Sequence, residues 1–102
     1  MDFVSIKKSD KPEKKLMAIF RNKKTKKDKQ VYFGSSANKD YTIYSKSDKV
    51  KAEKMKSAYI ARHKVRENWN DPMSAGALSR YILWNLPTIS ASIKDYKKRF
   101  NF

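Results

Sequence analysis

The chain has 102 residues, of which 25 are Lys or Arg and 10 are Asp or Glu, so its formal net charge is +15. This length fits a single domain with one modest hydrophobic core. Cysteine is absent and His63 is the only histidine, which excludes a disulfide framework and a thiolate or histidine-rich metal site. We therefore expect no metal and no cofactor. No apolar run reaches about 18 residues, so no membrane span is expected, and the first residues do not resemble a signal peptide.

The positive charge is spread along the chain, because residues 1–30, 31–72 and 73–102 carry net charges of +7, +4 and +4. A small domain needs a net charge of about 2–8 for solubility, and a larger excess opposes compaction. A polyanionic partner is the simplest explanation for this excess, and nucleic acid is the commonest such partner. Anionic membranes and acidic proteins are the alternatives.

The N-terminal part predicts a β-hairpin. Residues 1–14 are Lys-rich and are interrupted by Pro12, so we expect a flexible basic N-terminus, followed by one small domain over residues 15–102. The apolar segments 16–20 and 30–34 flank a Lys-rich connector, which is typical of a hairpin with a solvated tip. Residues 41–44 have strand character and are a candidate third strand.

Three helices are expected in the rest of the chain. The first spans residues 48–67, with Ser47 or Asp48 as its N-cap. The second spans about 72–84 and begins at Asp71-Pro72, with Ser74 as an alternative cap. The third spans about 89–100 after Thr88. The first and third helices carry apolar stripes at helical spacing, formed by Ala52, Met55, Tyr59 and His63, and by Ile89, Ile93, Tyr96 and Phe100. The fold class is therefore α+β, an N-terminal β-hairpin, with or without a third short strand, packed with three α-helices.

Several short blocks over about residues 30–102 resemble a known family. They are Tyr32-Phe33-Gly34, Asp40-Tyr41-Thr42, Tyr59-Ile60-Ala61-Arg62-His63, Glu67-Asn68-Trp69, the segment Ser74-Ala75-Gly76-Ala77-Leu78-Ser79-Arg80-Tyr81-Ile82-Leu83-Trp84-Asn85, and Ser92-Ile93-Lys94-Asp95-Tyr96 with Phe100. In this order they resemble a family of short uncharacterised proteins of nucleocytoplasmic large DNA viruses, the giant viruses. The resemblance implies a viral protein located in the virion, and in the host cytoplasm or nucleus during infection. It implies no particular activity.

The region around His63 has two interpretations. Arg62 and Arg66 would contact phosphate while Glu67 tunes His63, or the four side chains would form an internal ion-pair network that holds the helix against the Trp69 loop. General acid–base chemistry is not expected, because no nucleophile motif and no glycine-rich phosphate loop accompanies His63 and Glu67. The sequence thus predicts that the protein is not an enzyme.

Three further side chains are ambiguous or structural. Trp84 ends an apolar helix face and is expected in the core, whereas Trp69 is compatible with a core position or with an exposed contact to bases. Arg80 would pair with an acid such as Asp71 or Asp40, or point outward to phosphate.

Lysine outnumbers arginine twenty to five, which favours binding to backbone phosphate without reading sequence. We therefore expect a non-sequence-specific DNA-binding protein that condenses or packages a viral genome, with double-stranded DNA as the preferred partner. The expected contacts are Lys23, Lys24, Lys26, Lys27, Lys54, Lys56, Arg62, Arg66, Lys94, Lys97 and Lys98.

The alternative is a structural protein of the virion that oligomerises and binds acidic partners through its lysines. A homodimer is compatible with both hypotheses, and no small-molecule substrate is expected. The choice between DNA and RNA, any sequence preference and the stage of infection stay open.

Overall fold

The predicted hairpin is confirmed and forms two strands of a three-stranded sheet. A computed structural model describes all 102 residues. Strands β1 (Asp2–Lys8), β2 (Lys14–Arg21) and β3 (Asp28–Ser35) form an antiparallel sheet in the order β1-β2-β3. Apolar residues of β2 and β3 face each other in the register Leu16↔Phe33 and Ala18↔Val31, which places one apolar face toward the helices.

Strand β1 lies where the sequence predicted a flexible terminus. Its alternation is broken by a β-bulge between Phe3 and Ser5, so Phe3 and Ile6 both pack against the core although they are three residues apart. Apolar and polar residues therefore do not alternate regularly in this strand, and the sequence does not show the pattern that predicts a strand. Pro12 lies in the turn that joins β1 to β2, where it interrupts neither strand.

The candidate third strand at residues 41–44 is wrong, because these residues begin helix α1 (Tyr41–Ser47). Asp40 is the N-cap of this helix, and its side chain accepts hydrogen bonds from Thr42 N at 2.9 Å and Ile43 N at 3.2 Å. The capping carboxylate therefore overrides the β propensity of the aromatic and β-branched residues that follow it.

Helix α2 (Lys49–His63) agrees with the first predicted helix but ends four residues earlier. Asp48 is its N-cap, as expected, and also ends α1, since its backbone N–H donates to Tyr44 O. Ala52 and Tyr59 are buried, and Met55 packs against the same core, so the predicted apolar stripe is confirmed.

The second predicted helix begins at its alternative cap. Ser74 caps α3 (Ala75–Leu78), and the chain continues into a short π-helix η1 (Ser79–Leu83). The third predicted helix is confirmed as α4 (Ile89–Phe100), with Thr88 as its N-cap. The fold is therefore α+β, a three-stranded antiparallel sheet with four α-helices.

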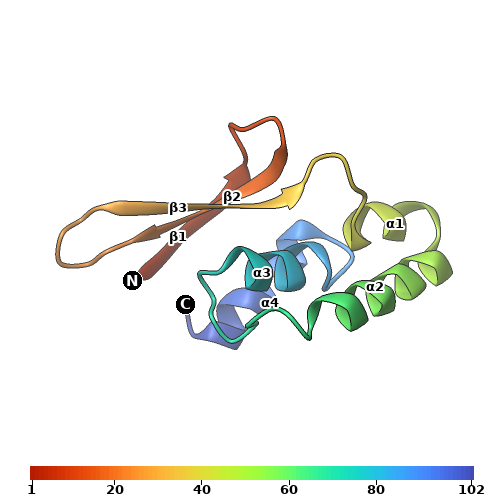
Figure 1. Cartoon of the computed structure of the whole chain (residues 1–102). Coiled ribbons are helices and arrows are strands. Elements are labelled where there is room, and N and C mark those ends of the chain that lie inside the picture. The colour runs from red at the N-terminus through yellow and green to blue at the C-terminus, as the bar shows by residue number, and fades with distance from the viewer.

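The helices cover one face of the sheet and extend beyond one of its ends (Figure 1). Segment α3–η1 and helix α4 lie under the strands, whereas α1 and α2 lie beyond the end of the sheet, opposite the β2–β3 turn. The molecule is elongated, with extents of 46 × 27 × 24 Å. None of its helices combines the length and apolarity needed to cross a bilayer.

Aromatic side chains join the sheet to the helices. Phe3, Phe20, Tyr96 and Phe102 form a cluster with ring centroids 5.7–6.0 Å apart. At the other end of the core the Trp84 ring stacks on Tyr59 at 4.6 Å. Trp84 is 9% exposed, so its predicted core position is confirmed.

Candidate nucleic-acid interface

The β2–β3 turn carries the densest group of expected contacts. We call residues 22–27 the basic tip; it contains Lys23, Lys24, Lys26 and Lys27, all exposed. Asn22 organises the turn, because its side-chain oxygen accepts from Lys24 N at 2.9 Å and Thr25 N at 3.1 Å. Lys26 has a left-handed backbone with φ of 61°. The lysines are therefore held on an ordered turn.

Acidic groups near the basic tip are engaged by neighbouring cations. Arg21 Nε donates to Asp28 Oδ1 at 2.7 Å, and this hydrogen bond lowers the pKa of Asp28 and raises that of Arg21. Lys23 lies 3.5 Å from Asp2, with both side chains largely exposed. Lys24, Lys26 and Lys27 have no carboxylate partner, so their charges are open to a polyanion.

Helix α2 and the turn that follows it divide their expected contacts between surface and interior. Lys54, Arg62 and Arg66 are exposed, and none of them pairs with a carboxylate. Lys56 instead points inward, where its amino group donates to Asn85 O at 2.8 Å and lies 4.8 Å from the centre of the Tyr41 ring. Burial, followed by the nearby Arg80 charge, lowers the pKa of Lys56. We therefore leave Lys56 out of the interface.

Arg80 takes neither of its two expected roles. Its guanidinium donates to Trp84 O at 2.7 Å, and it pairs with neither Asp71 nor Asp40. Arg80 is half-buried against the rings of Trp69 and Tyr81. Arg80 and Lys56 thus donate to the consecutive carbonyl oxygens of Trp84 and Asn85, just beyond the end of η1. Two cations at this position stabilise the negative end of the helical segment.

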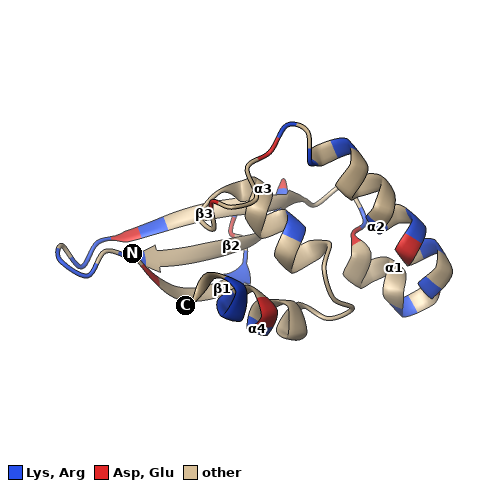
Figure 2. Ribbon diagram, turned by 90° about the horizontal axis from the view of Figure 1, so that it is seen from below, with Lys and Arg blue, Asp and Glu red and all other residues tan.

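The last turns of α4 form another exposed basic group. Lys94, Lys97 and Lys98 are exposed, and Lys97 lies 5.9 Å from the centre of the Phe3 ring. Arg99 is partly neutralised by Asp95 at 3.3 Å. The structure thus brings the expected contacts together in separate groups rather than on one continuous face, with blue segments at the tip, along α2 and on α4 (Figure 2).

The His63 region forms a structural hydrogen-bond chain without the two arginines. His63 Nδ1 lies 3.0 Å from Glu67 Oε1, and Trp69 Nε1 donates to Glu67 Oε2 at 2.8 Å. Glu67 therefore ties the end of α2 to the loop that follows it, as the structural interpretation expected, but only His63 and Glu67 of the four expected side chains take part. Arg62 and Arg66 make no bond to Glu67 and remain exposed.

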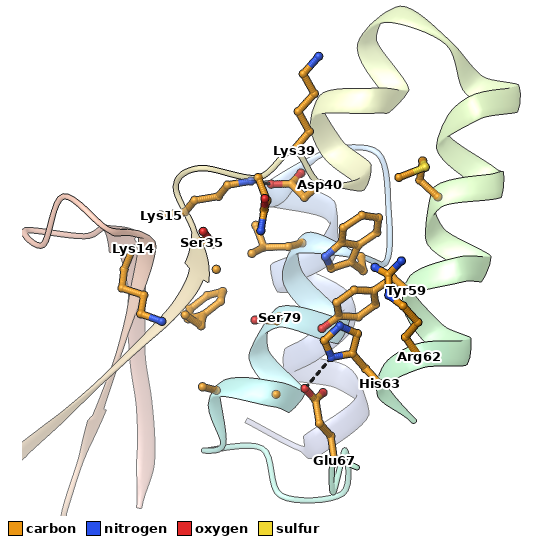
Figure 3. A pocket seen from close by; sticks show the side chains of 18 of the residues that line it. Lys14, Lys15, Ser35, Lys39, Asp40, Tyr59, Arg62, His63, Glu67 and Ser79 are labelled. Atoms are coloured by element: carbon orange, nitrogen blue, oxygen red, sulfur yellow. Dashed lines mark hydrogen bonds and ion pairs between the residues drawn. The ribbon is translucent and has the colours of Figure 1, made fainter. Parts of the chain in front are cut away.

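A cavity of about 480 Å³ is lined by the end of the sheet, by α2 and by the α3–η1 segment (Figure 3). We call it the basic cleft. Its lining includes Lys14 and Lys39, which were absent from the expected contacts, and Arg62, which was among them. The lining comes from four separate stretches of sequence, so no local motif revealed it. One signal was available, because the two glycines of the chain, Gly34 and Gly76, both line this cleft.

A family model described as a family of unknown function (DUF5754) matches residues 4–63. The chain belongs to this family. The match includes β1, the hairpin, α1 and α2, whereas the resemblance described from the sequence lies in residues 30–102. No curated protein and no solved structure matches the chain.

Proposed function

We propose that this protein binds double-stranded DNA without sequence specificity and condenses or packages a viral genome in the virion. The observation that carries the proposal is the β2–β3 ribbon, which projects away from the helices and ends in the basic tip (Figure 1). A major groove about 12 Å wide admits a two-stranded β-ribbon, and adjacent strands lie about 4.8 Å apart. Because β1 pairs with β2 as far as Asp2↔Arg21, only the turn at residues 22–27 extends beyond the three-stranded sheet. This turn is two chains wide, so it has a suitable width to enter a groove and place its lysines against phosphates.

The composition of the tip supports binding that ignores base sequence. Its four cations are lysines, whose ammonium groups contact phosphate as point charges. It contains no arginine for bidentate contact with guanine. The viral setting is part of the proposal and is supported by the sequence blocks that resemble giant-virus proteins.

The alternative role, a structural virion protein, is less well supported. Two features would favour it, the small residues 75–77 and a partly exposed Trp69. Ala77 is fully buried, Gly76 lies against Glu67, and Trp69 is bonded to Glu67. Gly76 and Ala77 are therefore covered within the chain, whereas Ala75 is exposed and Trp69 is partly exposed.

The test is a titration with random-sequence duplex between about 50 and 200 mM salt. The logarithm of affinity should fall linearly with the logarithm of salt concentration, with a slope of about −0.9 per neutralised phosphate. Replacing Lys23, Lys24, Lys26 and Lys27 by Gln should reduce the magnitude of this slope by up to about 3.6. A duplex RNA competitor shows whether DNA is preferred.

A charge-matched control replaces Lys7, Lys8, Lys11 and Lys39 by Gln, which are exposed and unpaired with carboxylates. It should change the slope less than the tip variant does. An equal change would show that the tip is not the main contact. Failure of the unmodified protein to bind DNA at about 50 mM salt would contradict the proposed function altogether.

A further inference from the structure

The basic cleft contains positive charge that no carboxylate of the chain neutralises. Of its lining cations, Lys15 pairs with Asp40 at 2.6 Å. The second carboxylate of the cleft, Glu67, is engaged by His63 and Trp69. Lys14, Lys39 and Arg62 have no such partner. An anion in the cleft would therefore meet free cations.

Two of these cations approach the cleft from different walls. Lys14 directs its amino group from the sheet toward the cavity, and Arg62 extends from α2 beside Tyr59 (Figure 3). Lys39 lies at the rim with its amino group pointing away. In Figure 3 the two cationic groups lie on opposite sides of the cavity, with Tyr59 between them. Both flexible side chains must therefore extend inward for one group with several negatively charged oxygens to contact them together.

The backbone around the cleft is specialised. Gly34 has a φ of +80°, and a Cβ there would lie 2.5 Å from Leu83 Cδ1. A Cβ at Gly76 would lie 2.9 Å from Glu67 Oε2. Ser79 and Leu83 of the π-helix also line the cavity, and such short π segments are frequent at functional sites. Both glycines and the π-helix thus shape this one region.

The size and lining of the cleft limit the ligand. Small-molecule sites have volumes of about 300–1,000 Å³, and this cavity is far larger than a single phosphate ion. Met55, Leu83 and Trp84 add apolar surface beside the cations. We propose that the basic cleft binds a small phosphate-bearing molecule of nucleotide size, with Lys14 and Arg62 contacting the phosphate and the apolar residues contacting its organic part. This site stands independently of DNA binding at the tip.

The two glycines make the test direct, because their backbone amides give two identifiable NMR signals from the cleft itself. Titration of the full chain with AMP should shift both glycine signals in a saturable manner. Inorganic phosphate should displace AMP, and adenosine should produce no shift at the same concentration. Absence of glycine shifts with AMP, or equal shifts with adenosine, would overturn the proposal.

Single substitutions locate the phosphate. Lys14→Met and Arg62→Gln should each weaken AMP binding about tenfold or more, and both side chains are exposed, so the fold should be retained. Lys39→Met is the matched control from the same cleft and should change the dissociation constant by less than about twofold. If all three substitutions weaken binding equally, a diffuse positive field rather than a built site attracts AMP, and the proposal is wrong.

The phosphate can belong to a free nucleotide or to the end of a strand. A short single strand with and without a 5′-phosphate distinguishes these sources. A tenfold preference for the phosphorylated strand that disappears in Arg62→Gln identifies a strand end, whereas AMP binding without this preference identifies a free nucleotide. The variant with the four lysines of the basic tip replaced by Gln should bind AMP with unchanged affinity. AMP binding can therefore be tested whether or not the protein binds DNA.

Discussion

At the scale of single residues, Gly76 shows how one neighbour reverses an intrinsic preference. Alanine normally stabilises a helix by about 1 kcal/mol relative to glycine. At Gly76 the added Cβ would lie 2.9 Å from Glu67 Oε2, and Glu67 is held by both His63 and Trp69. The carboxylate can move aside only by weakening those two hydrogen bonds.

We therefore predict opposite effects of Gly76→Ala in two backgrounds. It should lower the free energy of unfolding by about 1 kcal/mol in the unmodified protein, through loss of a hydrogen bond. It should raise that energy by about 1 kcal/mol in Glu67→Ala, where the helix propensity acts alone. Urea denaturation of the four proteins of this cycle measures the coupling, and additive effects would contradict the argument.

Two buried tyrosines give the stability of the protein an alkaline limit. Burial raises the pKa of Tyr59, with a further contribution from Glu67, and burial also raises the pKa of Tyr96, with a smaller effect of Asp71. Above about pH 10 the unfolded chain releases phenolic protons that the folded chain retains. Since the folded state then binds more protons, its stability is maintained below about pH 10 and falls as the pH rises further.

The substitution Tyr96→Phe tests this pH dependence. It removes the hydrogen bond that the hydroxyl donates to Pro72 O at 2.6 Å, so stability at pH 7 should fall by about 1 kcal/mol. Its decline between pH 9 and 11 should be shallower than in the unmodified protein, as measured by urea denaturation at each pH. Lys56, whose pKa is lowered by burial, acts with the opposite sign in both proteins and cancels in the comparison. Parallel declines would contradict the assignment.

At the scale of elements, Asp40 joins the sheet to the helices. It caps α1 and also pairs with Lys15 of β2 at 2.6 Å while being only 3% exposed. Asp40→Ala should lower the free energy of unfolding by about 3 kcal/mol, because both the cap and the partner of a half-buried ammonium are lost. Asp40→Asn keeps an amide oxygen for the cap but loses the ion pair with Lys15. It should therefore lower the free energy of unfolding less in a Lys15→Met background than in the unmodified protein. Urea denaturation measures both, and an equal cost in the two backgrounds would mean that the ion pair contributes nothing.

Elements with regular spacing could be predicted from the sequence, and irregular ones could not. The apolar side chains from Ile89 to Phe100 recur with the period of an α-helix. The sequence therefore predicted α4 together with its N-cap, Thr88. Strand β1 was missed because its bulge breaks the alternation between Phe3 and Ile6. Residues 41–44 have strand propensity, but the N-cap at Asp40 overrides it and begins a helix.

The candidate sites follow the same division. The basic tip could be predicted because its lysines are contiguous in the sequence. The inward direction of Lys56 could not, since its partner Asn85 is 29 residues away. The basic cleft could not be predicted for a related reason, because Lys14 and Arg62 line one cavity only after the chain has folded. The sequence shows that the chain has only two glycines, but their shared location at the cleft appears only in the fold.

At the scale of the whole molecule, charge lies at both ends of a body 46 Å long. The basic tip marks one end, and the α1–α2 junction marks the other (Figures 1 and 2). We call the second group the helical end; it contains Lys46, Lys49, Lys51 and Lys54, all exposed. The Debye length at physiological salt is about 8 Å, so the two ends act on phosphates independently. One molecule could then contact two duplexes, which is what condensation of a genome requires.

This arrangement predicts that bridging needs both ends while binding needs only one. Replacing residues 22–27 by Asn-Gly shortens the ribbon to a two-residue turn that still closes the Arg21↔Asp28 pair. The shortened protein should retain measurable affinity for one duplex through its remaining lysines but lose energy transfer between donor- and acceptor-labelled duplexes. Replacing the four lysines of the helical end by Gln should have the same effect. The control variant, in which Lys7, Lys8, Lys11 and Lys39 are replaced, loses the same total charge but keeps both ends intact. It should therefore still bridge two duplexes. If it loses bridging as completely as the end variants do, total charge rather than its placement at two ends brings duplexes together.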